Sequence, residues 1–395
     1  MSRIQILLFL SLYILSVSML SIRELYWSNI ESKRHSLCNN GELGAVMSEL
    51  RSRSKDTHGT ISHIQEGGGL GNVFCRILMA QIVALVSNRT LQVITRGSAL
   101  LSLLVPSSSF YGWHKELASE NDAKHVPYRE LLYEVYHDKH VIVTDLPPNP
   151  IDKDKHALHA LQKYLRRAHR NVSSDDVVGC LAAEFIRPGP AVRSELDRIA
   201  KMFREKISIA VHLRVSDWDM AVYMGNPTAL SMQNSGTNHR KLGLDYTGAA
   251  RRKSGCTTDF SWGGCIYRYH DVLQRHQNKS VVYFVAADSI SNVNRFEETM
   301  SQKNASIFRS PGHPLHTGRP THTERANETH GAKKALLDFL LLASADYFVG
   351  NCPVGGSSFT WNVYNMRLRA SSALGLGDVC AKVNTGERGV LQSVT

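Results

Sequence analysis

The stretch Ile207–Asp219, ISIAVHLRVSDWD, constrains the fold most, because a strand pattern runs directly into a cluster of charged side chains. Apolar residues alternate from Ile207 to Leu213, and the run is short and rich in β-branched residues, which predicts a strand. The polar residues at its end are His212, Arg214, Ser216, Asp217 and Asp219. In an open α/β sheet, ligands bind just beyond the carboxyl ends of strands.

Arg214 suits a phosphate ligand, because its planar guanidinium donates two parallel hydrogen bonds and stays charged at physiological pH. A surface salt bridge between Arg214 and Asp217 is the alternative interpretation of the same residues. Other segments of the chain bear on this choice.

The totals of the sequence limit the classes of partner. The 395 residues leave room for two domains, and the formal net charge is +11. A positive protein of this kind suits nucleotide sugars, acidic glycans, membrane surfaces or nucleic acid. The chain has no zinc-finger spacing, no basic helix with heptads and no aromatic strand typical of RNA binding, so we expect no nucleic-acid partner.

The segment Ile4–Ile22 is almost entirely apolar and lies between Arg3 and Arg23. It is just long enough to span a bilayer as a helix, which predicts a signal anchor over residues 1–22, with a short cytosolic tail and a lumenal body. A cleaved signal peptide is the alternative, because Ser16–Ser18 offers small residues for cleavage. The protein would then be secreted or lumenal. Residues 23–57 are polar and predict a stem.

Sequons and cysteines agree with the secretory pathway. Five N-x-S/T triplets begin at Asn88, Asn171, Asn278, Asn304 and Asn327. Seven cysteines could form three disulfides and leave one over, and Cys256 with Cys265 is the most plausible local pair. Cys38 in the predicted stem could instead join two chains, so a homodimer is possible. The sequence contains no C-x-x-C motif, so we expect neither a redox site nor a structural zinc site.

The first half of the body alternates strands and helices around a glycine-rich turn. A strand over 59–64 leads into Gln65–Asn72, followed by a helix over 73–86 and a strand over 91–95. Such a turn lets a backbone approach a ligand and aims helix N–H groups at it. Asn72 stands where a dinucleotide fingerprint needs its third glycine, and no Gly-Lys-Ser/Thr follows. A tight turn without a ligand is the alternative.

The second half repeats the alternation. Val281–Ala286 predicts a strand that ends near Asp288, and Lys333–Ala343 predicts an apolar helix containing Asp338. The strand Tyr347–Val349 then leads through small residues and hydroxyls into a helix from Thr360, which is a second place for a phosphate. The histidines at 313, 316, 322 and 330 match no metal-ligand spacing, so a mobile loop is favoured over a metal site.

Together these patterns predict an α/β protein with two facing Rossmann-like domains and a nucleotide in the cleft between them. We place the N-terminal domain at residues 58–188. The C-terminal domain spans 189–380, and residues 381–395 form a tail. A strand over 141–145, a loop-rich region before it and an exposed basic helix over 151–169 complete the first domain.

Three segments resemble the superfamily of GDP-fucose-dependent fucosyltransferases of the α1,2, α1,6 and protein-O type. HLRVSD at 212–217 resembles the H-x-R-x-G-D motif of that superfamily, and GGGLGN at 67–72 resembles its G-L-G-N loop. DFLLLASADYFVGNCPVGGSSFTWNV at 338–363 resembles its third motif, and VVYFVAAD at 281–288 is similar to its strand ending in Asp. The resemblance covers residues 60–365. It implies a GT-B-like fold, with the N-terminal domain on the acceptor side and the C-terminal domain binding the GDP-sugar donor.

The resemblance implies roles for single residues. Arg214 would bind the pyrophosphate of GDP-fucose and stabilise the charge on departing GDP. His212 would line the nucleotide pocket, and Asp288 and Asp338 would lie near guanosine. The remaining donor-binding residues would face the phosphates or the two substrates; they are Ser357, Ser358, Phe359, Gly69, Gly71 and Asn72.

The resemblance further implies a Golgi, single-pass type II enzyme that inverts the sugar carbon with GDP-fucose as co-substrate and without a metal or bound cofactor. The acceptor would be a glycan or glycoprotein. Asp217 and Asp219 spell D-x-D, a metal motif of another glycosyltransferase fold, but their place after H-x-R favours coincidence. By proximity to Arg214 they are candidate catalytic bases.

The chain departs from the superfamily pattern at two places. Ser216 replaces the glycine of the motif, and the insertion over 217–264 is long. These departures keep two alternatives open. The protein could be a GT-B enzyme that uses another nucleotide sugar, or a non-catalytic lumenal relative that binds glycans.

Overall fold

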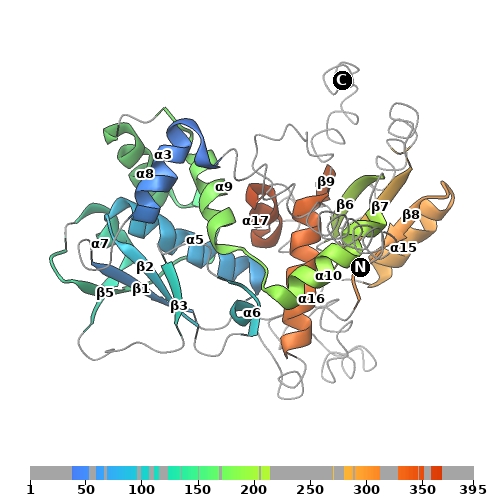
Figure 1. The fold of residues 1–395 in the computed structure, drawn as a ribbon, viewed down its shortest axis with the longest axis horizontal. Helices are drawn as coiled ribbons and strands as arrows, with labels where there is room; N and C mark the ends of the chain where they lie inside the picture. Colours follow the sequence, from blue (N-terminus) through green and yellow to red (C-terminus); the bar gives the residue numbers. More distant parts are fainter. Residues whose placement is uncertain are drawn as a thin grey trace, which may run out of the picture.

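The computed structural model describes residues 38–52, 59–65, 69–95, 99–105, 111–114, 123–134, 136–149, 151–168, 171–203, 206–213, 270, 280–287, 290–311, 328–345, 347–350 and 357–366. Structural statements below concern these residues. Within them the protein is α/β, with two parallel sheets and helices packed against them (Figure 1). This confirms the α/β class that the sequence predicts.

The first sheet has five parallel strands in the order β3-β2-β1-β5-β4. Their bounds are β1 Thr60–Ile64, β2 Thr90–Ile94, β3 Tyr111–His114, β4 Lys124–Pro127 and β5 His140–Thr144. Because β1 lies in the middle, the glycine-rich turn that follows it leaves from the centre of the carboxyl edge. The region before β5, which the sequence predicts as loop-rich, contains β3 and β4, so that prediction is wrong.

One helix dominates the packing on this sheet. In α5 (Leu70–Val86), every residue except Asn72, Arg76 and Val86 is buried. A helix that is apolar on all sides must be covered on all sides. It packs on β1 and β2, and its other faces meet α7 (Tyr128–Tyr133), α8 (Lys155–Arg167), α9 (Ser174–Phe185) and α17 (Ser358–Met366). The short elements η1 (Ile151–Lys153) and α6 (Ala99–Ser102) complete this half.

The second sheet has four parallel strands in the order β8-β7-β6-β9. They are β6 Ile207–Leu213, β7 Val281–Ala287, β8 Ser306–Phe308 and β9 Tyr347–Gly350. All seven residues of β6 are buried, as expected for a parallel strand covered on both faces. The helices of this half are α10 (Pro190–Ala200), η2 (Lys201–Phe203), α15 (Ile290–Ser301) and α16 (Glu328–Ser344).

The core of the first half continues into the second. Phe74 of α5 makes edge contacts with Phe185 of α9, at 5.4 Å between ring centroids, and with Phe339 of α16, at 5.0 Å. Trp361 of α17 is 1% exposed and belongs to the same apolar cluster. Figure 1 shows α17 and α16 between the two sheets. The two halves therefore share one continuous apolar core along α5, α16 and α17.

Part of the predicted stem belongs to this folded body. Residues Gly41–Ser52 form α3, and Val46, Met47 and Leu50 are at most 1% exposed. Cys38 forms a disulfide with Cys180 of α9. The stem prediction is therefore wrong over residues 38–52. The segment is polar on average, but its few apolar residues recur at helical spacing and form one narrow buried face.

The predicted membrane anchor is not tested by the structure. None of the helices in the described ranges is long and apolar enough to cross a membrane. The predicted anchor, residues 1–22, lies outside those ranges, as does the predicted Cys256–Cys265 pair.

Candidate functional site

The first component of the site is a histidine near the carboxyl end of β6. His212 is 6% exposed, and it pairs with Gly350 of β9 and Ala286 of β7 across the sheet. Its Nδ1 lies 3.0 Å from Oγ1 of Thr360, and its ring stacks on Phe359 with centroids 4.7 Å apart. The first turn of α17 thus fixes the imidazole at the ligand-binding edge of the second sheet.

The second component is the contact between the glycine-rich turn and the start of α17. Oγ of Ser358 donates to Oδ1 of Asn72 at 2.7 Å. A Cβ on Gly71 would lie 2.5 Å from the backbone nitrogen of Phe359, so no larger side chain fits there. Three predicted donor-binding residues, Gly71, Asn72 and Ser358, are therefore in direct contact across the two halves.

Asn362 locks the two helices together. Its side chain is fully buried, and Nδ2 donates to the carbonyl oxygens of Gly71, at 3.0 Å, and Ser358, at 2.7 Å. The same nitrogen lies 3.2 Å from Sγ of Cys75, one turn further along α5. Because Gly71 meets the first turn of α17 and Cys75 meets the next turn, the helices run side by side in the same direction.

This arrangement aims two helix N-termini at one place. Gly69 is the N-cap of α5 and provides no side-chain hydrogen bond to the first turn. A Cβ on Gly69 would meet no atom within 4 Å, so the space beside it is open. Each helix N-terminus carries a partial positive charge and N–H groups that lack helical partners. Two of them side by side favour an anion such as a diphosphate.

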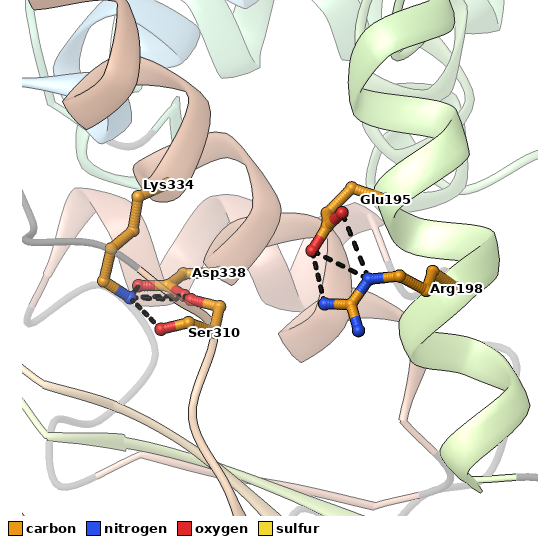
Figure 2. Close-up of polar contacts among 5 residues, drawn as sticks. All are labelled: Glu195, Arg198, Ser310, Lys334 and Asp338. Carbon is orange, nitrogen blue, oxygen red and sulfur yellow. Dashed lines mark hydrogen bonds and ion pairs between the residues drawn. The ribbon is translucent and has the colours of Figure 1, made fainter.

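Asp338, a predicted donor-binding residue, forms a buried ion pair with Lys334. It is 6% exposed on α16, and Nζ of Lys334 lies 2.9 Å from its Oδ2 and 3.1 Å from its Oδ1. Oγ of Ser310 also donates to the carboxylate, and Nζ of Lys334 donates to that hydroxyl at 2.6 Å. Figure 2 shows the three side chains converging from α16 and the segment after β8.

Through these contacts Asp338 joins α16 to the segment that follows β8. The carboxylate and ammonium compensate each other, and Ser310 satisfies further hydrogen-bonding capacity, which buried charges require. On the other side of the same segment, Arg309 pairs with Glu297 of α15 at 2.9 Å. The chain leaving β8 is therefore held from both sides. Contact of Asp338 with guanosine stays a prediction.

A second polar pair beside this cluster is of another kind. Arg198 and Glu195 on α10 form an exposed ion pair with 2.6 Å between Nη2 and Oε1 (Figure 2). The hydrogen bond from Arg198 lowers the pKa of Glu195 below its ordinary value. Exposed pairs of this type contribute little to stability, so Arg198 is a suitable control residue.

Sequence reasoning missed a buried histidine directly before the glycine-rich turn. His63 of β1 is 5% exposed, and its Nε2 lies 3.0 Å from Oε1 of Gln65, which is 2% exposed. Burial lowers the pKa of His63 to about 4, against the raising effect of the hydrogen bond with Gln65. The imidazole is therefore neutral at physiological pH. The available signal was that His63 and Gln65 follow Ile61 at alternate positions, on the face of a strand that leads into the glycine-rich turn.

Four predicted residues, Arg214, Asp217, Asp219 and Asp288, lie outside the described residues. The described parts of β6 and β7 end at Leu213 and Ala287, which pair with each other. Arg214 and Asp288 follow these two residues in the sequence. Within the described ranges, no three His, Cys, Asp or Glu side chains gather as a metal site would require.

Comparison with known proteins gave only structural similarities. No protein-family model matches the chain. No curated protein matches it either.

Solved structures with a similar fold include FUT1 from Arabidopsis thaliana, a mutant in complex with GDP, at 12% identity and a TM-score of 0.48, covering 86% of this chain and 76% of that one. They also include NodZ alpha-1,6-fucosyltransferase soaked with GDP-fucose, at 14% identity and a TM-score of 0.47; the match covers 78% of this chain and 93% of that one. Other NodZ structures are from Bradyrhizobium. POFUT1 in complex with GDP-fucose matches at 13% identity and a TM-score of 0.41, and the match covers 80% of this chain and 95% of that one. Because these TM-scores are below 0.5, we base the functional proposal on the residues of this chain.

Proposed function

We propose that this protein is an inverting, metal-independent glycosyltransferase that moves fucose from GDP-fucose to a glycan or glycoprotein. One observation carries the proposal: Gly71 and Asn72 of the glycine-rich turn touch Ser358 and Phe359 of α17, and Phe359 stacks on His212. These residues come from three segments that resemble fucosyltransferase motifs. Their contact supports a single site built from all three.

The described residues suit the diphosphate of the donor. The N-termini of α5 and α17 lie side by side and attract a negative charge at the open space beside Gly69. The hydroxyl of Ser358, held by Asn72, stands at the start of α17. In this proposal Arg214, which follows β6, supplies the remaining positive charge, and Asp288 lies near guanosine.

The two sheets correspond to the two facing Rossmann-like domains of a GT-B enzyme in this proposal, with the donor between them. In the transfer step, an acceptor hydroxyl oxygen forms a bond to the anomeric carbon while the bond from that carbon to the phosphate oxygen breaks. Displacement from the opposite face inverts the carbon. The hydroxyl proton passes to a base, for which Asp217 and Asp219 are the candidates.

Charge balance explains why the leaving group needs the two helix N-termini. GDP departs with an additional negative charge, and positive groups fixed beforehand stabilise that charge more in the transition state than in the ground state. We further propose a Golgi location with a type II anchor in residues 1–22, consistent with the disulfide between Cys38 and Cys180 in a compartment where such bonds persist.

The test is donor turnover by the full-length chain with EDTA present throughout. GDP-fucose, GDP-mannose and UDP-sugars are supplied separately, and release of the nucleoside diphosphate is followed. We expect turnover of GDP-fucose alone, loss of it in Arg214→Ala, and partial retention in Arg214→Lys, which keeps the charge without the fork. Arg198→Ala, an exposed arginine on α10, is the matched control.

The outcomes separate the parts of the proposal. Turnover of another nucleotide sugar would exclude fucose as the natural donor, and a requirement for added Mg²⁺ or Mn²⁺ would exclude the metal-independent mechanism. Absence of both turnover and GDP binding would overturn the enzyme proposal as a whole.

A further inference from the structure

The outer end of the first sheet carries an exposed aromatic side chain that the proposed donor site does not use. Tyr133 is 51% exposed, and it is the one aromatic among the exposed large apolar side chains of the described residues. It lies at the end of α7, which packs against α8 (Figure 1). The face of its ring is therefore accessible to a ligand.

The orientation of this ring is fixed by α8. The hydroxyl of Tyr133 lies 3.2 Å from Nδ1 of His156, and the two rings meet edge to face with centroids 6.1 Å apart. A ring that is already held loses little conformational entropy when it binds a ligand. Tyrosine offers a large, rigid surface with an apolar face and a polar tip, which suits the mixed character of a sugar ring.

An arginine stands beside this tyrosine. Arg129 precedes Tyr133 by four residues on α7, which places both on one side of the helix. Nε of Arg129 donates to the hydroxyl of Tyr128 at 3.1 Å, and that hydroxyl donates to Oδ2 of Asp154 at 2.5 Å. These bonds fix the guanidinium through a buried carboxylate, since Asp154 is 9% exposed.

Among the described residues, none accepts a hydrogen bond from the terminal nitrogens of Arg129. In the ranges that the structure describes, Nε makes the only hydrogen bond of this side chain, which is exposed. Asp154 is already satisfied by Tyr128 and by the backbone nitrogens of His156 and Ala157. A guanidinium held at Nε with a free fork matches the two oxygens of a carboxylate or a sulfate.

Charges of both signs lie nearby: the exposed carboxylates of Glu130 and Glu134, and the ammonium group of Lys155. Glu130, the adjacent carboxylate on α7, accepts a hydrogen bond of 2.5 Å from the hydroxyl of Tyr136. Lys155, next to His156, is exposed and adds a further positive charge. We name Arg129, Tyr133 and His156 the α7 patch.

We propose that the α7 patch binds a pyranose residue that carries a carboxylate or a sulfate, with the sugar ring on Tyr133 and the anion on Arg129. The role of this sugar as part of the acceptor glycan rests on the proposed function. Its binding to the α7 patch does not depend on that function. The protein would thus prefer acidic glycans over neutral ones.

The position of the patch suits an outer part of an extended acceptor. Pro127, the last residue of β4, pairs with Thr144 of β5, and β5 pairs with β1. The start of α7 is therefore two strands away from the glycine-rich turn, about 10 Å along the carboxyl edge at the usual strand spacing. An oligosaccharide can span this interval, with its reacting end at the donor.

The experiment measures binding of defined oligosaccharides to the full-length protein by calorimetry. The probes are an oligogalacturonate, which carries carboxylates, a heparin-derived oligosaccharide, which also carries sulfates, and neutral chitotetraose. We expect the wild type to bind at least one acidic probe more tightly than chitotetraose. Arg129→Gln and Tyr133→Ala should each weaken that binding about tenfold, the loss typical of a charged hydrogen bond. The preferred acidic probe tells carboxylate from sulfate.

Two controls make the result specific. Arg198→Gln removes the same charge from an exposed arginine on α10 and should leave binding unchanged. Tyr133→Phe keeps the ring and should retain most of the affinity. Equal weakening by Arg129→Gln and Arg198→Gln, equal affinity for chitotetraose, competition by a single-stranded oligonucleotide, or no binding of either acidic probe would each overturn the proposal.

GDP binding, measured on the same samples, tests the proposed function separately. A wild-type protein that binds the acidic probe but no GDP would overturn the transferase and leave the α7 patch in place. A protein that binds GDP and releases it from GDP-fucose, but ignores the acidic probes, would do the opposite.

Discussion

Ser358 donates a hydrogen bond of 2.7 Å to Asn72 across a sequence separation of 286 residues. The bond joins the first turn of α17 to the first turn of α5, and the Gly71–Phe359 approach and the Asn362 amide reinforce it. Neither helix start is therefore positioned independently. The two halves of the proposed donor site form a single unit, and changes on one side should be felt on the other.

The Asn72–Ser358 pair should show energetic coupling. Asn72→Ala and Ser358→Ala each remove one partner, and the double variant removes both. Because residues in direct contact are not additive, we expect a coupling of about 1 kcal/mol in the free energy of unfolding. Denaturant unfolding of the four proteins measures it. Strictly additive effects would mean that the bond contributes nothing.

Gly71 and Gly69 offer a sharper comparison within one turn. Gly71→Ala forces a Cβ within 2.5 Å of the Phe359 backbone, so the helices must separate. We expect a destabilisation of about 1–3 kcal/mol and weaker GDP binding. Gly69→Ala meets no atom within 4 Å, and its φ of −63° suits alanine.

The measurement for this pair is urea unfolding together with GDP titration. Gly69→Ala should stay within about 0.5 kcal/mol of the wild type. If Gly71→Ala is as stable as Gly69→Ala, then α5 and α17 are not in the close contact described.

Several elements could be predicted from the sequence because their signal is local. Short apolar runs identified the strands later assigned as β1, β2, β5, β6, β7 and β9, with clear alternation only in β6, and the small residues before α17 marked its start. The region of β3, β4 and α7 could not be predicted in this way. β4 is only four residues long, begins with the exposed residues Lys124 and His125 and ends in Pro127, so it lacks a regular apolar alternation.

The candidate site, like the fold, could be predicted only where its sequence signal is local. The motifs suggested which residues belong to it, but the contact of Gly71 with Phe359 depends on how two distant helices pack, which no local pattern encodes. The role of Lys334 was missed because a lysine in a helix is ordinarily solvated. Only its burial beside Asp338 and Ser310 gives it significance.

Lys334 should matter far more for stability than its residue type suggests. Lys334→Met leaves the Asp338 carboxylate buried without its cation, and we expect a loss of about 3–5 kcal/mol. Lys334→Met combined with Asp338→Leu should recover a large part of it, because no charge is then left unpaired. Chemical unfolding measures both.

The control for this comparison is Arg198→Gln, which breaks an exposed pair on the neighbouring helix α10 and should cause no measurable change. A double variant as unstable as Lys334→Met would mean that packing, and not the uncompensated charge, decides the loss.

The disulfide between Cys38 and Cys180 should stabilise the first half of the molecule. It closes a sequence separation of 142 residues, and the chain-entropy estimate for loops of this size is about 4–5 kcal/mol. The variant with both cysteines changed to serine should unfold at lower temperature and resemble the reduced wild type. Non-reducing peptide mapping should link Cys38 to Cys180 within one chain; a Cys38–Cys38 dimer would contradict the structure.

The final prediction concerns the neutral, buried imidazole of His63 before the glycine-rich turn. Burial lowers its pKa in the folded state to about 4, whereas the ordinary pKa of a solvated histidine is 6.5. Between these values the unfolded chain binds a proton that the folded protein does not. The contribution to stability is therefore fully present above pH 6.5 and is lost as the pH falls toward 4. The difference of about 2.5 pH units corresponds to about 3 kcal/mol.

Denaturant unfolding at pH 7 and pH 4.5 measures this dependence, with His63→Gln as the test variant. Glutamine does not titrate and can still donate to the Gln65 side chain, so the variant should lose less stability on acidification than the wild type. His159→Gln, an exposed histidine on α8, should leave the dependence as it is in the wild type. Because Gln65 leads directly into the glycine-rich turn, protonation of His63 should also weaken GDP binding at low pH. An identical acid sensitivity in wild type and His63→Gln would show that other groups govern it.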